Sequence, residues 1–383
     1  MKNSLVFLLL VLTQFSLGQT TNEYLTIDQK MAQIPDSLTK TTDGIAKYIN
    51  SNFKTESEKI RAVFYWTTTN IVYDVPNMFE PNQLDSPQEK IEKTLKSRKG
   101  VCIHYAETFK DITTKLDIKT YIISGYTKQA GQVAPISHAW CASKIEGKWF
   151  LFDPTWGAGY VDQQQFVKKR NDNFFKVEPK KMINSHMPFD YLWQFLNVPW
   201  TNQEFYDGKE AVNKVKKNFD YLAEIEQHQT LSEEEQAFQA AERVEKNGFK
   251  NPLISKYHTY LKNQFTGLTQ NKNIEKLNEV VANYNEAIGH LNDFMFYRQR
   301  NFKPVVSDEE MKNMMKTIKD KFKKCNDDVY KIGSVGSQNS AMLSGLKKNI
   351  SQNLLVVEKQ ETFLNDYLSK TMAGRKLMLS RQR

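Results

Sequence analysis

The sequence predicts an α+β domain over residues 19–205 followed by an all-α domain over residues 206–383. All six tryptophans and nine of the eleven prolines lie before residue 201, so the two parts differ in composition. After about residue 206, helix-capping signals and apolar residues at helical spacing recur without a repeat of fixed period. A chain of 383 residues is long enough for two or three domains, each with its own core.

The first part contains helical patterns and then strand patterns. The helical patterns cover residues 38–53, 56–72 and 102–116. The strand-like runs follow at Thr120–Tyr126, Ser137–Ile145 and Trp149–Asp153, and Glu146-Gly147 joins the last two. Helices followed by consecutive antiparallel strands are typical of an α+β domain.

The second part reads as a series of capped helices. Ser232 with Glu235 forms a capping box, Asn251-Pro252 begins a further helix, and Ser307 with Glu310 caps a later one. The apolar stripes of these helices carry no motif of chemical type, so we interpret them as core. Cys325, near a predicted helix end, is interpreted as a free surface thiol or a link between two chains.

Residues 1–18 have the pattern of a cleavable signal peptide. Lys2 precedes an apolar run from Leu5 to Leu12, and Ser16-Leu17-Gly18 offers small residues before Gln19. No later stretch reaches the ~18 apolar residues of a membrane-spanning helix. We therefore expect a secreted or periplasmic protein whose mature chain has no transmembrane segment.

The numbers of basic and acidic residues indicate which classes of molecule the chain is expected to bind. The chain has 53 basic and 44 acidic residues, a net charge of +9. This moderate excess favours contact with anionic surfaces, a cell-envelope component among them, without specifying nucleic acid. The basic tail from Lys370 to Arg383 lacks interleaved aromatic residues, so no nucleic-acid partner is expected.

Cys102 is a candidate nucleophile. It begins the predicted helix 102–116, where unpaired N–H groups and the helix dipole favour a thiolate. Gly100, two residues earlier, would leave room for the backbone of a substrate. A thiol in this place still needs a base.

The predicted strand hairpin offers His138 as that base, because side chains alternate between the two faces of a strand. If Glu146-Gly147 is a two-residue turn, Trp140 lies opposite Asp153 and His138 lies opposite Thr155. His138 and Asp153 then share one face as diagonal neighbours ~7 Å apart at the backbone. A three-residue turn would move Asp153 to the other face. With helix 102–116 packed on this sheet, the sequence predicts a Cys102–His138–Asp153 triad.

Three separated motifs resemble the transglutaminase-like superfamily, and within it the branch related to kyphoscoliosis peptidase. They are Lys99-Gly100-Val101-Cys102, His138-Ala139-Trp140, and the run from Gly147 to Gly157 that contains Phe152-Asp153-Pro154. The upstream segment from Arg61 to Asp74 resembles the first core helix of that family, and the segment from Met182 to Pro188 resembles the one that closes its domain. The resemblance covers roughly residues 40–205.

The resemblance implies a papain-like arrangement and acyl transfer through a thioester. Cys102 would be the nucleophile, His138 the general base and acid, and Asp153 the orienting carboxylate, with the Cys102 backbone N–H holding the oxyanion. The acyl donor would be a glutamine-type or peptide amide of a protein or peptide substrate, the acceptor an amine or water, and no cofactor is needed. Ile103-His104 stands where animal transglutaminases have tryptophan, and no acidic calcium loop is present, which disfavours calcium-activated crosslinking.

Other interpretations of the same residues remain. A zinc site is disfavoured by poor ligand spacing and opposite strand faces; it would use Cys102, His104, His138 and Cys141. A Cys102–Cys141 disulfide would abolish the nucleophile. Trp140 and Trp156 could wall a substrate cleft or pack in the core, and His186 is interpreted as a structural residue.

The sequence therefore leaves three candidate functions. The first is a secreted thiol peptidase or acyltransferase that uses Cys102, His138 and Asp153. The alternative is a catalytically inactive scaffold that binds a protein or cell-envelope partner. A weaker third hypothesis, an amidase or peptidase of the cell wall, rests only on export and positive charge.

Overall fold

The computed structural model describes residues 24–79, 85–212 and 218–380. The predicted signal peptide, residues 1–18, lies outside these ranges. The chain divides into two compact units, one comprising the residues up to Gln227 with Arg243–Tyr257, the other His228–Glu242 with His258–Arg383. The first unit thus extends beyond the predicted boundary at residues 205 and 206.

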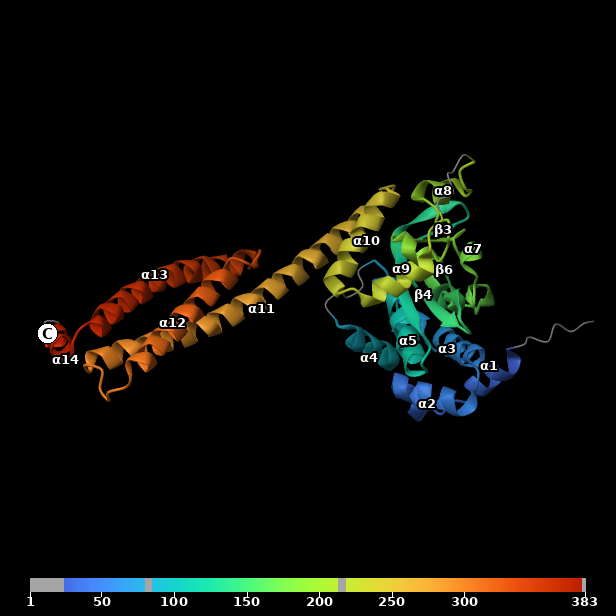
Figure 1. Ribbon diagram of the computed structural model, residues 1–383. Helices are drawn as coiled ribbons and strands as arrows, with labels where there is room; N and C mark the ends of the chain where they lie inside the picture. The colour runs from blue at the N-terminus through green and yellow to red at the C-terminus, as the bar shows by residue number, and fades with distance from the viewer. Residues whose placement is uncertain (1–23, 80–84, 213–217, 381–383) are drawn as a thin grey trace, which may run out of the picture. The chain divides into compact units, whose positions relative to one another are not determined.

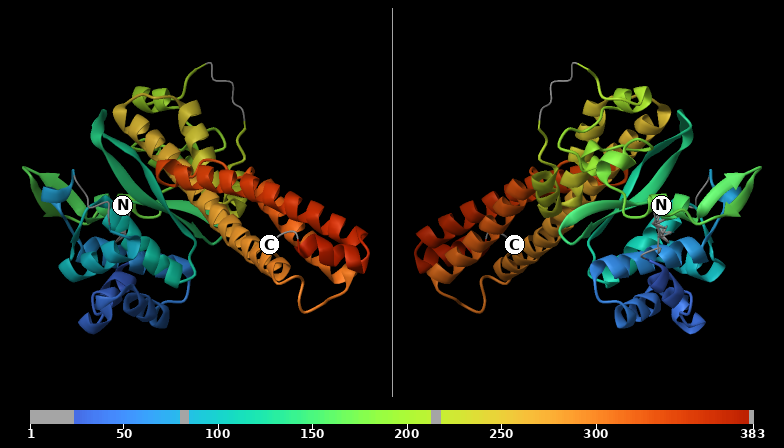
Figure 2. Two further views of the ribbon diagram at one scale, coloured as in Figure 1. Left: turned by 90° about the vertical axis from the view of Figure 1, so that its left-hand side faces the viewer. Right: turned by 90° about the vertical axis from the view of Figure 1, so that its right-hand side faces the viewer.

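The first unit is built around a four-stranded antiparallel sheet with the strand order β5-β4-β3-β8. The strands are β3 (Thr120–Gln129), β4 (Gln132–Ile145), β5 (Lys148–Phe152) and β8 (His186–Pro188). Two small pairs accompany it: β1 (Val72–Tyr73) with β2 (Lys99–Gly100), and β6 (Gly159–Asp162) with β7 (Gln165–Lys168). Figure 2 shows the long β3–β4 ribbon, in teal, from two sides.

The first unit also contains helices, of which α5 (Cys102–Lys115) makes the most extensive contact with the sheet. They are α1 (Leu25–Met31), α2 (Thr42–Asn52), α3 (Glu56–Asn70), α4 (Pro87–Ser97), α5 (Cys102–Lys115), α6 (Pro154–Ala158), α7 (Pro179–Met182) and α8 (Asn202–Asp207). The helical patterns predicted at 56–72 and 102–116 are confirmed as α3 and α5. The pattern predicted at 38–53 is a 3-10 turn, Asp36–Lys40, followed by α2.

Helix α5 packs on one face of the sheet, against β4 and β3 (Figure 1). Its Phe109 ring lies 5.6 Å from that of Phe152, and the Cys141 thiol donates to the carbonyl oxygen of Ala106 at 3.5 Å. Because side chains alternate along a strand, Trp140 belongs to a second core on the other face. An α+β core with a cysteine-bearing helix on an antiparallel sheet is therefore present as predicted.

The remaining helices confirm the helical C-terminal region. They are α9 (Tyr221–Thr230), α10 (Glu233–Asn247), α11 (Pro252–Gln299), α12 (Asp308–Val329), α13 (Gly336–Ser369) and α14 (Met372–Ser380). In the second unit, α12 and α13 lie alongside α11 (Figure 1), and residues of all three share two apolar cores. None of the described helices combines the length and apolar character needed to cross a bilayer.

The expectation that Cys325 is a surface thiol is wrong. Its side chain is 2% exposed and packs in an apolar core with Val329 and Ile350. The buried residues of α12 recur at helical spacing on one face, and Cys325 continues that series: Met311, Met315, Ile318, Phe322, Cys325 and Val329. The neighbouring lysine and asparagine suggested exposure, but the periodicity of the helix decides which face a residue takes.

Candidate active site

Cys102 stands at the N-terminal end of α5, where the preceding backbone is well fixed. The parallel pair β1–β2 sets Tyr73 beside Gly100, and the Val101 N–H donates to His104 Nδ1 at 2.9 Å. As the first residue of the helix, Cys102 has a backbone N–H without a partner inside the helix. Its half-buried thiol is free, as are the buried thiols of Cys141 and Cys325.

The hairpin has the predicted register. Glu146 and Gly147 have φ angles of 50° and 83° and form a two-residue turn, and Cys141 pairs with Phe152 across β4 and β5. Asp153 is the next residue along and falls opposite Trp140, so the parity argument is confirmed. The strand ends before Asp153, which instead caps the helix α6 that begins at Pro154.

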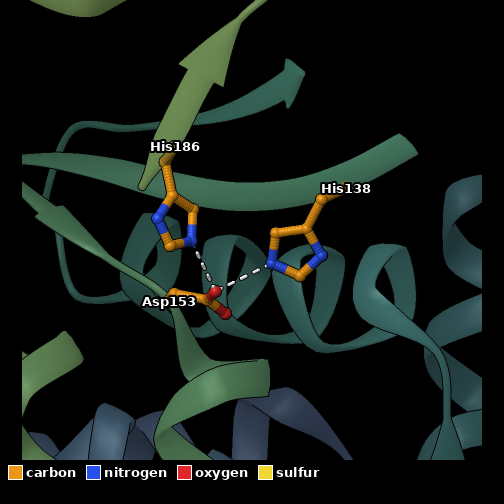
Figure 3. Close-up of side chains that lie close together, drawn as sticks. All are labelled: His138, Asp153 and His186. Carbon is orange, nitrogen blue, oxygen red and sulfur yellow. Dashed lines mark hydrogen bonds and ion pairs between the residues drawn. The ribbon is translucent and has the colours of Figure 1, made fainter. Parts of the chain in front are cut away.

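His138 and Asp153 form a direct hydrogen bond. The imidazole Nε2 lies 2.7 Å from Asp153 Oδ2. Figure 3 marks this bond with a dashed line. Burial by itself lowers the pKa of His138, but the Asp153 carboxylate and the hydrogen bond and charge of Cys102 raise it to about 10. His138 is therefore an imidazolium at neutral pH that interacts with the Asp153 carboxylate and with the sulfur atom of Cys102.

Asp153 is fully buried, and both of its oxygens accept hydrogen bonds. Oδ1 accepts from the backbone N–H groups of Thr155, at 2.8 Å, and Trp156, at 3.0 Å. Oδ2 accepts from His138 and from His186. Burial would raise the pKa of Asp153, but the charge of His138 and the hydrogen bonds of both imidazoles hold it well below its ordinary value. The carboxylate therefore stays ionised without contact with water.

His186 is a member of this group that the sequence analysis missed. Its Nε2 lies 2.9 Å from Asp153 Oδ2, a bond that Figure 3 marks with a dashed line. Its Nδ1 lies 2.8 Å from Ser185 Oγ. The strand β8 brings it here by pairing with β3, with His186 opposite Thr127. Burial lowers the pKa of His186 more than Asp153 raises it, so it is a neutral imidazole at neutral pH. The only signal in the sequence was the resemblance of the segment around it.

The same three side chains could also be considered as a metal site. His138, Asp153 and His186 present ligand atoms that all lie within 4.8 Å of one another. His138 Nε2, Asp153 Oδ2 and His186 Nε2 are joined by hydrogen bonds, and these bonds account for the arrangement. The zinc set considered from the sequence does not assemble, because His104 accepts from Val101 and Cys141 donates to Ala106.

A cleft of about 930 Å³ lies beside His138. Trp156 lines it, and its ring is 5.9 Å from that of His138. Trp140 does not take the place of a cleft wall: it is fully buried, stacked on His138 at 6.1 Å, where it supports the imidazole from the core.

Gly100 is also buried, and close packing against His104 restricts this position to glycine. A Cβ at this position would lie 2.6 Å from the Cβ of His104, the side chain that accepts from Val101. The room that Gly100 provides is therefore taken by the helix start itself. The expectation that it gives a substrate space is replaced by this contact.

The α+β fold, with a cysteine at a helix start and an imidazole–carboxylate pair on the adjoining hairpin, is that of the transglutaminase-like class. Residues 43–154 match the model of the Transglutaminase-like superfamily, so the chain carries a domain of that family.

Curated relatives agree with this assignment. The chain is 31% identical to human kyphoscoliosis peptidase over 172 residues, which is 42% of the chain and 26% of that protein. It is 32% identical to the mouse protein over 169 residues, 41% of the chain and 25% of that protein. It is 24% identical to hillarin of Drosophila melanogaster over 204 residues, 48% of the chain and 24% of that protein. The match thus spans about a quarter of the length of these relatives.

Two solved structures are similar to part of the chain. One is a transglutaminase, with 16% identity and a TM-score of 0.25 over 42% of this chain and 40% of that one. The other is a proposed cysteine protease from Cytophaga hutchinsonii, with 22% identity and a TM-score of 0.25 over 39% of this chain and 50% of that one.

Proposed function

We propose that this protein is an exported thiol enzyme that transfers or hydrolyses the acyl group of protein or peptide amides, with Cys102 as nucleophile. The observation that carries the proposal is the 2.7 Å hydrogen bond between His138 and Asp153, on an imidazole whose pKa is also raised by Cys102. A nucleophile, a base and an orienting carboxylate in this order are what thioester chemistry requires.

In the first step, Cys102 Sγ, as the thiolate of the pair with the His138 imidazolium, bonds to the amide carbonyl carbon, and the oxyanion is held by the backbone N–H at the start of α5. The C–N bond then breaks as the His138 imidazolium gives its proton to the leaving amine, which leaves a thioester. In the second step, water or an amine gives a proton to His138 and attacks the carbonyl carbon of the thioester. The C–S bond then breaks, the carboxylic acid or the new amide leaves, and the thiolate–imidazolium pair is restored. Asp153 keeps its charge throughout and stabilises the imidazolium.

Export is the part of the proposal that concerns residues 1–18. Their apolar run and small residues support cleavage before Gln19. Expression of the full chain in a bacterial host, followed by fractionation and N-terminal sequencing, tests it. We expect the protein outside the cytoplasm with Gln19 first; an intact Met1 in the cytoplasmic fraction would contradict export.

Thiol reactivity is the first test of the chemistry. Iodoacetamide at pH 7 should alkylate Cys102 at least tenfold faster than it alkylates N-acetylcysteine, as peptide mapping by mass spectrometry would show. His138→Ala should remove the advantage. Cys325 is buried and cannot serve as the reference thiol. A Cys102 that reacts no faster than N-acetylcysteine would exclude an activated nucleophile.

Turnover is the second test. We expect wild-type protein to release ammonia or cleave bonds in casein or glutamine-containing peptides, with Cys102→Ala at background and His138→Ala reduced roughly 10³-fold or more. Activity on muropeptides but not on casein would favour the cell-wall amidase. If both variants keep full biological activity in cells, the domain is a binding scaffold and the enzyme proposal is wrong.

A further inference from the structure

The cleft beside His138 has a distinctive charge pattern. Residues of the β3–β4 ribbon, of the β6–β7 hairpin and of the segment after β7 line it. Among these described lining residues, three lysine or arginine side chains, Lys128, Lys169 and Arg170, join the His138 imidazolium, and none is aspartate or glutamate. Since the chain has 44 acidic residues, this absence belongs to the cleft and not to the composition.

The three cations differ in how far their charge is offset. Arg170 lies 2.9 Å from Asp28 and 3.4 Å from Asp172, and the same two carboxylates also pair with Arg61, so this cluster is balanced. Two arginines and two aspartates leave little net field in the cleft.

Lys128 and Lys169 keep an uncompensated charge. The Lys128 ammonium donates to the backbone carbonyl of Phe205, which does not neutralise it. Lys169 is exposed and has no carboxylate partner among the described residues. Asp153, the carboxylate that accepts from His138, is fully buried and paired with the His138 imidazolium. The cleft is therefore positive where a ligand would enter.

The rest of the lining is apolar and aromatic. Tyr73, Trp156, Phe166 and Phe174 contribute to it, and the Tyr160 side chain is 49% exposed on β6. Such a surface offers contact area for side chains and carbon stems, in addition to charge. A ligand with both amide backbone and anionic side chains fits this lining better than one with charge alone.

We propose that the cleft takes peptides with acidic side chains next to the reacting amide. The inference rests on the proposed function only in identifying the bound peptide as the acyl donor. Lys128 and Lys169 would pair with the flanking glutamates or aspartates, which favours such peptides over neutral and basic ones.

Binding can be measured without catalysis on the Cys102→Ala variant. The probes are three fluorescein-labelled decapeptides with a central glutamine flanked by glutamate, by serine or by lysine, followed by anisotropy. We expect the glutamate peptide to bind about tenfold tighter than the serine peptide and the lysine peptide to bind weakest. Raising the salt concentration from 50 to 500 mM should reduce the differences in Kd among the three peptides, because screening by salt weakens exposed ion pairs.

Reversing the charge of Lys169 tests whether the preference for the glutamate peptide depends on this cleft. Lys169→Glu, in the Cys102→Ala background, should weaken binding of the glutamate peptide about fivefold, in line with an exposed ion pair. Lys47→Glu on α2 makes the same change in net charge at an exposed site away from the cleft lining, and should change the Kd less than twofold. Equal Kd values for the three peptides, or equal effects of the two reversals, would overturn the proposal.

Two further arms separate the remaining outcomes. Heparin is the first competitor, added at the same concentration of negative charge as unlabelled glutamate peptide. If heparin displaces the labelled peptide as effectively as the unlabelled peptide does, the cleft binds polyanions and the peptide assignment is wrong. If Cys102→Ala binds the glutamate peptide but wild type turns over no peptide, the proposed function fails while this inference stands. If wild type turns over all three peptides equally well, this inference fails while the proposed function stands.

Discussion

The His186 imidazole donates its Nε2 proton to Asp153 Oδ2 at 2.9 Å, on the same oxygen that accepts from His138 at 2.7 Å. The two rings come from different strands, β8 and β4, and the carboxylate from the end of β5. Oδ1 of the same carboxylate is held by two backbone N–H groups. Asp153 therefore has little rotational freedom, and the direction of its Oδ2 toward His138 is fixed from three sides.

Loss of the His186 donor should reduce catalysis more than substrate binding. We expect His186→Leu to lower kcat about 10- to 100-fold with little change in KM, because Asp153 loses one of the bonds that orient it. His186→Gln keeps an N–H donor and should recover most of the rate. Both variants should lose about 1–3 kcal/mol of unfolding free energy, since Ser185 Oγ loses its imidazole partner. Equal kcat in the two variants would mean that His186 only fills space.

The ionisation of His138 can be read directly by NMR. Because its pKa is raised to about 10, its Cε1–H signal should not shift between pH 6 and pH 8.5. In Asp153→Asn the interactions with the carboxylate that raise the pKa of His138 are lost, so this pKa should fall and the signal should begin to shift within that pH range. His138→Gln assigns the signal. A His138 resonance that titrates near pH 6.5 in wild type would contradict the ion pair.

The same pKa makes stability depend on pH. The folded protein holds a proton on His138 that the unfolded chain releases near pH 6.5, so this stabilisation is complete below pH 6.5 and is lost as the pH rises toward about 10. In the Cys102→Ala background, where no thiolate offsets the imidazolium proton, we expect the unfolding free energy to fall between pH 6.5 and 8 relative to Cys102→Ala/His138→Gln, by at most about 1.4 kcal/mol per pH unit. Urea titrations at several pH values measure this, and parallel curves for the two proteins would contradict it.

Gly100→Ala should disturb the start of α5. Its Cβ would meet His104 Cβ at 2.6 Å, so the His104 side chain or the backbone must move. We expect a loss of about 1–3 kcal/mol of unfolding free energy and slower alkylation of Cys102. Gly267→Ala on α11 is the control, because its Cβ meets nothing within 4 Å and alanine favours the helix. Equal stability of the two variants would show that the Gly100 contact is not limiting.

Cys325 should be unreactive until the protein unfolds. Its thiol is 2% exposed, and burial raises its pKa, which disfavours the thiolate. In native protein, Ellman's reagent should react rapidly with Cys102 alone, and with all three cysteines in guanidinium. Cys102→Ala should abolish the fast phase. A second fast thiol in the native state would show that the second unit opens locally.

Local rules of pairing predicted the geometry of the hairpin. A two-residue turn at Glu146-Gly147 determines that Asp153 falls opposite Trp140, because side chains on a strand alternate strictly. The same local reasoning located Cys102 at a helix start. It could not locate His186, since β8 is three residues long and pairs with β3 at a distance in sequence of about 60 residues that no turn specifies.

At three positions the structure differs from an interpretation made from the sequence, for different reasons. Trp140 was open to interpretation as a cleft wall, but the second core formed with Trp149 and Leu192 encloses it. Gly100 was interpreted through a substrate, whereas its close neighbour is His104, one helical turn along. Cys325 could have been placed by the spacing of its own helix, a local signal that its charged neighbour obscured.

By itself, the order of residues determined the α+β core, the helical region after it and the facing of His138 and Asp153, because helix caps, turn length and strand alternation act over a few residues. Only the tertiary structure decided that His186 bonds to the same carboxylate and that Trp140 is enclosed. It also decided that Lys128 and Lys169 line one cleft whose described lining residues include no aspartate or glutamate. Those outcomes depend on segments that meet through packing, and packing is a property of the whole folded chain.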